Sequence, residues 1–317
     1  MTEFIISEDF PKNEAEFDKR FSTEQACFEY LFKLKWPSGF ECKKCGHGQY
    51  WYSRRGLYIC KKCERQHSLI AGTILQNSKK PVTCWFKAMW WFTTRKSGVN
   101  AINLKDLLGL GSYETAWSWL QKLRSCTIRQ GREKLSGKIE ADEFYIGGQQ
   151  SGGKRGRGAE HKCAVAIAVE KKGKKLGRIR LQSIDDCSQG SLNEFITKHI
   201  EKQSNVITDG WSGYAPLDAK GYEHDRVIQK EAQNKASGLP GANLVISLFK
   251  RLILGTFQGR FDKKHLQRYL DEFVFRFNRR STTFVGKRFM RIAEQAMFTE
   301  PLPYRLIING SPVAPQM

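Results

Sequence analysis

The spacing of apolar residues changes near residue 136 and divides the chain into two parts. In the first part, apolar side chains recur every three or four positions, as they do along one face of a helix. This pattern predicts helices over residues 17–36 and 83–94 and a pair of helices within 100–126. In the second part, short apolar runs predict strands at 137–146, 163–169, 178–184 and 205–208, and longer periodic runs predict helices at 189–200, 242–254 and 262–278. Strands and helices in this order predict a mixed α/β sheet with flanking helices.

Several residues are placed to begin or end the predicted helices. Ser22, Ser112 and Asp262 are expected to be N-caps, because a short polar side chain can accept a hydrogen bond from a first-turn amide. Gly255 is expected to end the helix that begins at residue 242, since glycine adopts the left-handed conformation of a helix C-terminus easily.

Two of the predicted strands carry an aspartate. Asp142 lies on the polar side of the alternation in GKIEADEFYIGG, and Asp209 follows the run NVIT. Two converging carboxylates repel each other unless cations lie between them, so the pair predicts a metal-dependent phosphoryl-transfer site. Taken alone, an aspartate at a strand end is more often a cap or a turn residue.

Four of the nine cysteines are regularly spaced. Cys42 and Cys45 form one CxxC pair, and Cys60 and Cys63 form a second pair after an intervening hairpin pattern at 50–52 and 57–59. Four thiolates at this spacing predict a structural zinc site. The remaining cysteines have no ligand spacing and are expected to be single buried thiols: Cys27, Cys84, Cys126, Cys163 and Cys187.

Two histidines lie close to this cysteine set. His47 and His67 are alternative zinc ligands, but surface histidines beside a complete set of four cysteines are the more frequent case. We therefore expect both to lie at the surface.

The charge of the chain restricts its partners and its compartment. There are 53 Lys and Arg against 32 Asp and Glu, a net charge of +21, which favours nucleic acid as a partner. No run approaches the ~18 apolar residues of a membrane span, and the acidic start MTEFIISEDFPKNEAEF is not a signal peptide. We expect no membrane partner, reduced thiols and a cytoplasmic, nucleoid-associated protein.

Basic residues gather in three places that suit contact with DNA phosphates. They lie among the aromatic residues of the cysteine-rich segment, in a glycine-rich loop at 149–158 and near residue 250; for each of them a solvated surface position is the alternative. The expected DNA contacts are Lys43, Lys44, Arg54, Arg55, Lys61, Lys62, Lys154, Arg155, Arg157 and Arg251. The glycine-rich loop is either a DNA-contacting segment or a plain linker.

The paired helices within residues 100–126 have the outline of a helix-turn-helix. A Gly-Leu-Gly turn at 109–111 joins them, and the second helix is expected to bury Ala116, Trp117, Leu120 and Leu123. Any pair of antiparallel helices has this pattern, but its position after a basic, cysteine-rich segment favours DNA binding.

In this order the motifs resemble prokaryotic insertion-sequence transposases, specifically the zinc-ribbon DDE branch related to the Merlin elements. The resemblance covers residues 17–292 and rests on the zinc ribbon, GKIEADEFYIGG, VITDGWSGY with GYEH, LPGANLVISLFKRLILGTFQG and HLQRYLDEFVFRFNRR. It implies an α/β fold in which a zinc ribbon and a helix-turn-helix-like segment precede an RNase H-like catalytic domain. It also implies double-stranded DNA, as transposon ends and target, and a homo-oligomer of at least two chains.

The resemblance assigns roles to four residues. Asp142 and Asp209 match the first two catalytic carboxylates, Asn243 stands where many DDE transposases have Glu, and Lys250 matches a basic residue two turns later. Members of this branch have Asn or His at the third position. The resemblance implies that the two acids and the amide hold catalytic Mg²⁺ or Mn²⁺, with two ions expected.

Other roles for the same helical residues stay open. Asn243 is also placed to cap its helix, and Lys250 is also a typical solvated charge. Glu272 is a rival third carboxylate, although its helix pattern places it on the polar face.

The expected function is that of a DNA transposase, which binds terminal inverted repeats and catalyses strand cleavage and strand transfer. The alternative is a catalytically inactive, transposase-derived DNA-binding protein with a zinc ribbon. The expected domains are a helical lead-in (1–36), the zinc ribbon (37–72), the helical DNA-binding segment (73–130), the catalytic domain (131–300) and a C-terminal tail (301–317).

Overall fold

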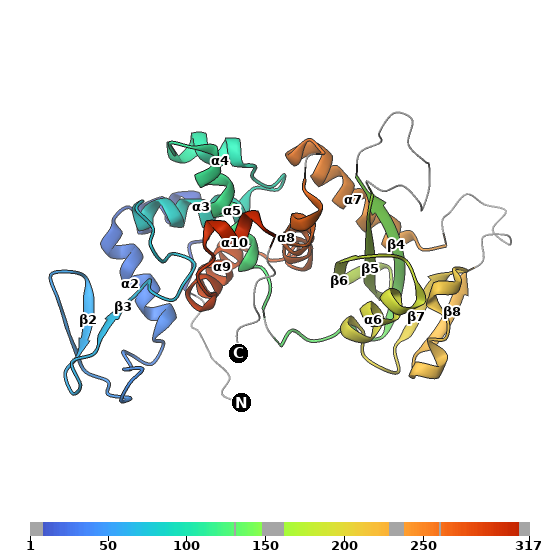
Figure 1. The fold of residues 1–317 in the computed structure, drawn as a ribbon, viewed down its shortest axis with the longest axis horizontal. Coiled ribbons are helices and arrows are strands. Elements are labelled where there is room, and N and C mark those ends of the chain that lie inside the picture. Colours follow the sequence, from blue (N-terminus) through green and yellow to red (C-terminus); the bar gives the residue numbers. More distant parts are fainter. Residues whose placement is uncertain (1–8, 130, 148–161, 228–237, 260, 311–317) are drawn as a thin grey trace. The chain divides into compact units, whose positions relative to one another are not determined.

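The fold was analysed in a computed structural model, which describes residues 9–129, 131–147, 162–227, 238–259 and 261–310 (Figure 1). The described residues form two compact units. The first contains the chain up to residue 129 and again from Ser281, and the second contains the chain from Gly131 to Arg280. The predicted glycine-rich loop, with Lys154, Arg155 and Arg157, lies outside the described residues.

The cysteine-rich segment folds as a small antiparallel sheet in the first unit. Its strands are β1 (Tyr50–Tyr52), β2 (Leu57–Cys60) and β3 (Gln66–Ser68), in the order β1-β2-β3. The predicted hairpin is confirmed, and β3 was not predicted because three residues are too few to show an alternation. Tyr58 of β2 packs in an aromatic cluster with Phe32 of the preceding helix, their ring centroids 5.2 Å apart.

The helices of the first unit surround an aromatic core. Their bounds are α1 (Glu14–Arg20), α2 (Glu24–Lys35), α3 (Val82–Thr94), α4 (Ala101–Leu108), α5 (Tyr113–Ser125), α9 (Gly286–Phe298) and α10 (Tyr304–Ile308). The single helix predicted over residues 17–36 is two helices, and Ser22 is not the cap of the second. Thr23 is the cap, because its side chain accepts the hydrogen bond from the Ala26 amide.

The helix-turn-helix outline is confirmed as a local structure. Gly109 ends α4 in the left-handed conformation, and the side chain of Ser112 accepts a hydrogen bond from the Thr115 amide at the start of α5. The buried tryptophan of α5 is Trp119, whose ring stacks on Trp85 of α3 with centroids 3.9 Å apart; Trp117 is only partly buried.

The end of the chain packs with the first unit. Helix α9 lies within the segment expected to belong to the catalytic domain (131–300), yet it packs against α2 and α3. The reason is Phe289, which is fully buried among Phe17, Phe21 and Phe86. Part of the expected tail is also folded, since α10 buries Ile307.

The second unit contains a mixed sheet in the order β6-β5-β4-β7-β8 (Figure 1). Strands β4 (Lys138–Ile146), β5 (Cys163–Lys172) and β6 (Lys175–Ile184) are antiparallel neighbours, whereas β7 (Asn205–Asp209) pairs parallel to β4 and β8 (Glu223–Val227) pairs parallel to β7. Helix α6 (Gln189–His199) packs on one face, and α7 (Pro240–Phe257) and α8 (Leu266–Asn278) on the other. The predicted mixed α/β fold with flanking helices is confirmed.

Helix α7 is longer at both ends than its apolar pattern indicates. It begins at Pro240, which suits a first turn because its missing N–H has no partner there in any case. It continues past Gly255 and ends at Gln258, which takes the left-handed conformation. The prediction that Gly255 ends the helix is therefore wrong. Among the described residues, no helix is both long and apolar enough to cross a bilayer.

Candidate active site and zinc centre

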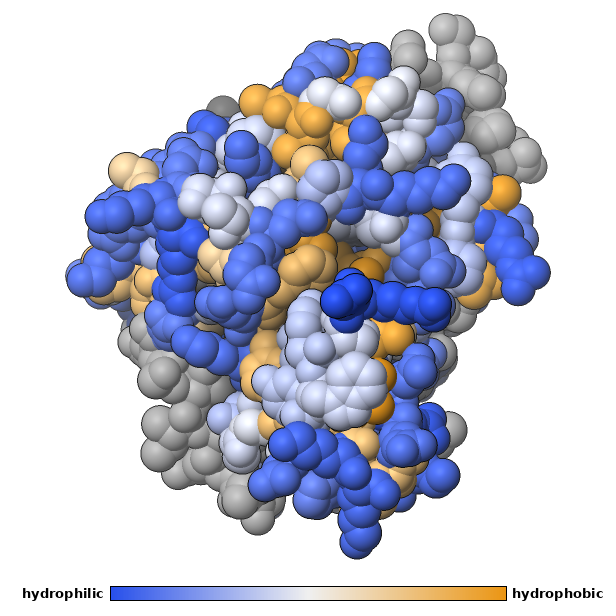
Figure 2. Space-filling view, turned by 90° about the vertical axis from the view of Figure 1, so that its left-hand side faces the viewer, coloured by the Kyte–Doolittle hydropathy of each residue, from blue (hydrophilic) through white to orange (hydrophobic). Residues whose placement is uncertain are grey.

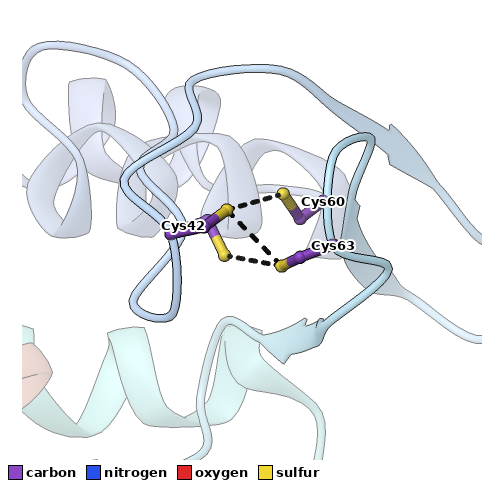
Figure 3. Close-up of side chains that lie close together, drawn as sticks. Cys42, Cys60 and Cys63 are labelled. Atoms are coloured by element: carbon purple, nitrogen blue, oxygen red, sulfur yellow. Dashed lines mark hydrogen bonds between the residues drawn. The ribbon is translucent and has the colours of Figure 1, made fainter.

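The four regularly spaced cysteines converge in the zinc ribbon. Their sulfur atoms all lie within 4.8 Å of one another, and Figure 3 shows Cys42, Cys60 and Cys63 pointing toward a common centre. The Sγ atom of Cys63 lies 3.5 Å from that of Cys42 and 3.5 Å from that of Cys45. A tetrahedral site with Zn–S bonds of about 2.3 Å requires sulfur separations of about 3.8 Å. The four side chains fit zinc and form a Cys₄ zinc-ribbon site.

His67 lies beside this site. It was expected at the surface, but it is not there. It is buried, and its Nε2 atom lies 3.3 Å from Cys42 Sγ. The ring also packs edge-on against Phe40, with centroids 5.4 Å apart. A histidine that hydrogen-bonds a ligand sulfur orients the ligand without coordinating the metal itself.

This contact predicts weaker zinc retention in His67→Ala. We expect zinc to be lost to a chelator about tenfold more readily, which is the usual cost of removing a side chain that orients a metal ligand. The matched control is His47→Ala, because the contacts of His47 with the site are made by its backbone: its carbonyl accepts from the Cys42 amide, and its amide donates to the Cys45 sulfur. Equal zinc retention in the two variants, measured by competition with a chromophoric chelator, would contradict the role of His67.

The basic residues of the ribbon are exposed. Figure 2, seen from the side of the ribbon, shows hydrophilic residues across that face with smaller apolar areas between them. The predicted DNA contacts that are described in the structure are all exposed: Lys43, Lys44, Arg54, Arg55, Lys61, Lys62 and Arg251. Their role as DNA contacts stays a prediction.

The two aspartates of the sheet lie on neighbouring parallel strands. Lys138 of β4 is paired with Asn205 of β7, and Asp142 and Asp209 are separated by the same number of positions. The last paired residues are Glu140 and Ile207, and the same register continued by two residues brings Asp142 level with Asp209. The charge of Asp209 also contributes to the raised pKa of Asp142, as expected of two nearby acids. Side chains alternate along a strand, so Asp142 shares a face with Phe144, and Asp209 shares that same face with Ile207.

The environment of Asp142 favours a cation. Burial raises the pKa of Asp142 to about 7, and the negative charges of Glu143, Asp209 and Glu140 contribute, against a hydrogen bond from the Glu143 amide. In the described parts of the chain, the four cysteines are the only converging group of three or more Cys, His, Asp or Glu. The sheet thus offers two carboxylates to a hard divalent ion, and the other oxygen ligands must come from an amide, water or phosphate.

The raised pKa of Asp142 predicts a pH-dependent stability in the absence of divalent cations. Between its unfolded value of 3.8 and its folded value of about 7, the folded chain holds a proton that the unfolded chain lacks. The free energy of unfolding therefore falls as pH rises from 3.8 to about 7, because the folded chain loses the proton on Asp142. We expect Asp142→Asn, without Mg²⁺ or Mn²⁺ but with zinc retained, to melt higher than wild type at pH 8.

The stability difference between Asp142→Asn and wild type should shrink as pH falls from about 7 toward 4, because the folded chain then keeps Asp142 protonated and no longer holds a buried charge. Thermal unfolding across this pH range measures the difference. Asp225→Asn is the control, because Asp225 is an exposed acid on β8 of the same sheet. A difference that does not change with pH would contradict the buried environment of Asp142.

Helix α7 carries the two remaining predicted site residues across the face of β4. Near its start, the Ala242 amide donates to Glu140 of β4, and two turns later Lys250 Nζ lies 5.7 Å from the centroid of the Phe144 ring. Asp142 stands between Glu140 and Phe144 on that face of the strand. Asn243 and Lys250 are both exposed and project from the helix that packs on this face.

The structure also addresses the alternative role of Asn243. Leu239 occupies the N-cap position of α7, and Asn243 lies in the first turn, where its Nδ2 donates to the Leu239 carbonyl at 3.0 Å. Asn243 is therefore not the helix cap.

Glu272 lies elsewhere and is not on a polar face. It is fully buried in α8, where it forms an ion pair with Arg276 at 2.9 Å. Helix α8 packs on β6, at the opposite edge of the sheet from β8. Glu272 is therefore part of an internal ion pair of that helix.

Two residues near the site were not predicted to take part in it. Glu140 is almost fully buried, and Tyr214, also buried, donates to Glu143 at 2.8 Å. Burial and the neighbouring Glu143 raise the pKa of Tyr214 well above its usual value, which keeps the hydroxyl protonated as a donor. For Glu140 the sequence contains one signal, since Glu140 and Asp142 are charged residues two positions apart on a strand with apolar neighbours.

Two family models of known proteins match this chain. Residues 134–278 match the ISXO2-like transposase domain, and residues 22–66 match the transposase zinc-ribbon domain. The chain carries both domains of a zinc-ribbon transposase. The first of these matches lies within the second compact unit, which holds Asp142 and Asp209. The predicted resemblance to insertion-sequence transposases of the zinc-ribbon DDE type is confirmed.

One relative of this chain comes from a mobile element. It is an uncharacterized protein in transposable element ISH50 of Halobacterium salinarum, 24% identical over 220 residues that cover 63% of this chain and 72% of that protein. A solved structure, a chain of the simian T-cell lymphotropic virus intasome in complex with PP2A regulatory subunit B56 gamma, is 13% identical. That match covers 52% of this chain and 63% of the other with a TM-score of 0.27, too low to carry an argument.

Proposed function

We propose that this protein is a DNA transposase that binds the terminal inverted repeats of its own element and catalyses metal-dependent strand cleavage and strand transfer. The observation that carries the proposal is that Asp142 and Asp209 lie on two paired parallel strands, two residues beyond the last paired residues Glu140 and Ile207, and on one face of the sheet. Two adjacent carboxylates, one of them largely buried, are costly to hold ionised without a bound cation.

Asp142 and Asp209, together with the side-chain amide oxygen of Asn243, would hold Mg²⁺ or Mn²⁺. When bound, such ions lower the pKa of a water molecule and stabilise charge on the attacking and leaving oxygens of a phosphodiester. Asp142 must lose its proton before it can bind a cation, so cation binding would release a proton near neutral pH. Asn243 would supply a neutral and therefore weaker ligand than the Glu that many DDE transposases have at this position.

Lys250 would contribute a positive charge on the same face. Its ammonium group is exposed and lies over Phe144, two positions after Asp142 on β4. From this position it would contact a DNA phosphate held near the two acids. A lysine acts there as a point charge that neutralises the phosphate without a fixed bidentate geometry.

Double-stranded DNA would be held mainly through phosphate contacts. The zinc ribbon exposes seven lysines and arginines, and the whole chain carries a net charge of +21. Phosphate neutralisation releases counterions, so affinity for DNA should fall steeply with salt. We further propose that two or more chains act together, because two transposon ends must be brought to one target.

A strand-cleavage and strand-joining assay tests the proposed function. The full chain with its zinc is incubated with DNA that carries the ends of its own element, a target duplex, and Mg²⁺ or Mn²⁺. Cleaved ends and joined products are expected, and neither should form without the divalent ion. Retention of the DNA with no cleavage in either ion would support the alternative, an inactive DNA-binding protein derived from a transposase.

A further inference from the structure

Strand β4 holds more than the first aspartate of the site. It also carries Glu140, which binds the start of α7, and Glu143, which binds the loop after β7. We infer that Glu140 and Glu143 are positioning residues, which align the helix of Asn243 and the loop after Asp209 with Asp142. This inference rests on the proposed function, because it concerns the same site.

Glu140 fixes the start of α7. Its Oε2 accepts from the Ala242 amide at 2.8 Å, and its Oε1 pairs with Lys171 of β5 at 3.0 Å. A carboxylate bound to a first-turn amide satisfies an N–H that has no partner within the helix, and it interacts favourably with the helix dipole. Since Asn243 directly follows Ala242, this contact sets the position of Asn243 along β4.

The residue at position 241 is part of the same arrangement. A Cβ on Gly241 would lie 2.8 Å from Glu140 Oε2 and 2.9 Å from a methyl carbon of Leu176. Only glycine lets the helix backbone approach the strand this closely without displacing one of these neighbours. The close approach brings the first turn of α7 onto β4.

Glu143 fixes the loop that follows β7. Asp209 Oδ1 accepts from the Trp211 amide at 3.0 Å, and the chain then turns through a short 3-10 helix at Ser212–Tyr214. The Tyr214 hydroxyl donates to Glu143 Oε2 at 2.8 Å. Tyr214 is fully buried, so the hydroxyl has little access to water as an alternative acceptor.

These contacts fix the positions of the site residues relative to β4. Asp142 Oδ1 itself accepts from the Glu143 amide at 2.9 Å, so the residue that binds Tyr214 also orients the first aspartate. The second and third site residues lie on separate elements, and each of these elements is fastened to β4 within two residues of Asp142. Groups that orient metal ligands in this way change metal affinity by about 10–100-fold when they are removed.

The test compares two pairs of variants of the full, zinc-loaded chain. Tyr214→Phe removes only the hydroxyl, and its control is Tyr222→Phe, a buried tyrosine of the same core cluster whose hydroxyl donates to the Ile200 carbonyl. Glu140→Gln changes a buried acid paired with Lys171, and its control is Glu170→Gln, a buried acid of the neighbouring strand paired with Arg178. In each pair the substitution and the burial are alike, but the partners of the controls carry no site residue.

The readouts are Mn²⁺ affinity, measured by electron paramagnetic resonance well below the melting temperature, and kcat and KM for DNA cleavage. Asp142→Asn defines the Mn²⁺ signal that belongs to the site. We expect Tyr214→Phe and Glu140→Gln to weaken this Mn²⁺ binding about tenfold and to lower kcat more than they raise KM, with both controls within about twofold of wild type.

Two results would overturn the inference. One is that Tyr214→Phe and Glu140→Gln match their controls in Mn²⁺ affinity. The other is that the wild-type protein shows no Mn²⁺ binding that Asp142→Asn removes, which would also remove the basis of the proposed function. A wild-type protein that binds Mn²⁺ at Asp142 but never cleaves DNA contradicts the proposed function alone, and the affinity comparison still decides the role of the glutamates.

Discussion

Asp142→Ala is expected to lose strand cleavage and strand joining together, by about three orders of magnitude or more. The loss should exceed the ~10²–10³-fold cost of removing one preorganised donor, because Asp142 would contribute to every cation that the site holds. Asp209→Ala should have a comparable effect, since Asp209 ends the parallel strand that pairs with the strand of Asp142. The measurement is product formation on the element's own ends in Mg²⁺ and in Mn²⁺.

The DNA-binding surface should be unaffected by these substitutions. The exposed basic residues of the ribbon lie in the other compact unit, so retention of terminal DNA in a gel-shift assay should stay near wild type. Asp225→Ala is the matched control, an acid on β8 that is exposed and accepts from Asn205. Turnover that survives in Asp142→Ala, or that falls equally in Asp225→Ala, would contradict the assignment of the site.

Cys60→Ser is expected to lose the zinc ion and the folded structure of the ribbon. Structural zinc contributes about 10–16 kcal/mol of apparent binding free energy in small zinc modules, and that free energy is folding free energy. The three strands of the ribbon are only three or four residues long, too short to be stable without the metal. Zinc content should fall from one ion per chain to none, and amide exchange in β1, β2 and β3 should become fast.

The control for this substitution is Cys84→Ser, which changes a partly exposed cysteine of α3 outside the cluster. It should keep its zinc and its amide protection. A Cys60→Ser protein that retains zinc, or a zinc-free wild-type protein whose ribbon amides stay protected, would contradict a structural role for the metal.

The elements that carry the site follow from the local sequence. Alternation around Asp142 and the apolar run before Asp209 predict the two strands, because side chains on a strand must point to opposite faces. The paired CxxC spacing predicts the ribbon, because four thiolates at that spacing can enclose one zinc ion. Each of these signals lies within about twenty residues of chain.

Contacts between distant residues could not be predicted in this way. The burial of His67 depends on Phe40 and Cys42, beside which the short strand β3 places the His67 ring. The ion pair of Glu272 with Arg276 is local, but its burial depends on the sheet beneath α8. Residues 286–298 fall within the expected catalytic domain, yet they form α9 on the aromatic core of the first unit, because an apolar face does not indicate which core it covers.

The same limit applies to the arrangement around Asp142. A glutamate at position 140 is an ordinary polar residue of an alternating strand until α7 places the Ala242 amide against it. The partnership of Tyr214 with Glu143 likewise joins residues 71 positions apart in the chain. Sequence pattern places residues on faces, whereas tertiary packing determines which faces meet.

The most direct test of this account is to locate the cations themselves in crystals of the protein with DNA ends and Mn²⁺, by anomalous scattering. We expect a manganese ion bound by carboxylate oxygens of both Asp142 and Asp209. Manganese found only at other residues, or two aspartates too far apart to share any ion, would contradict it.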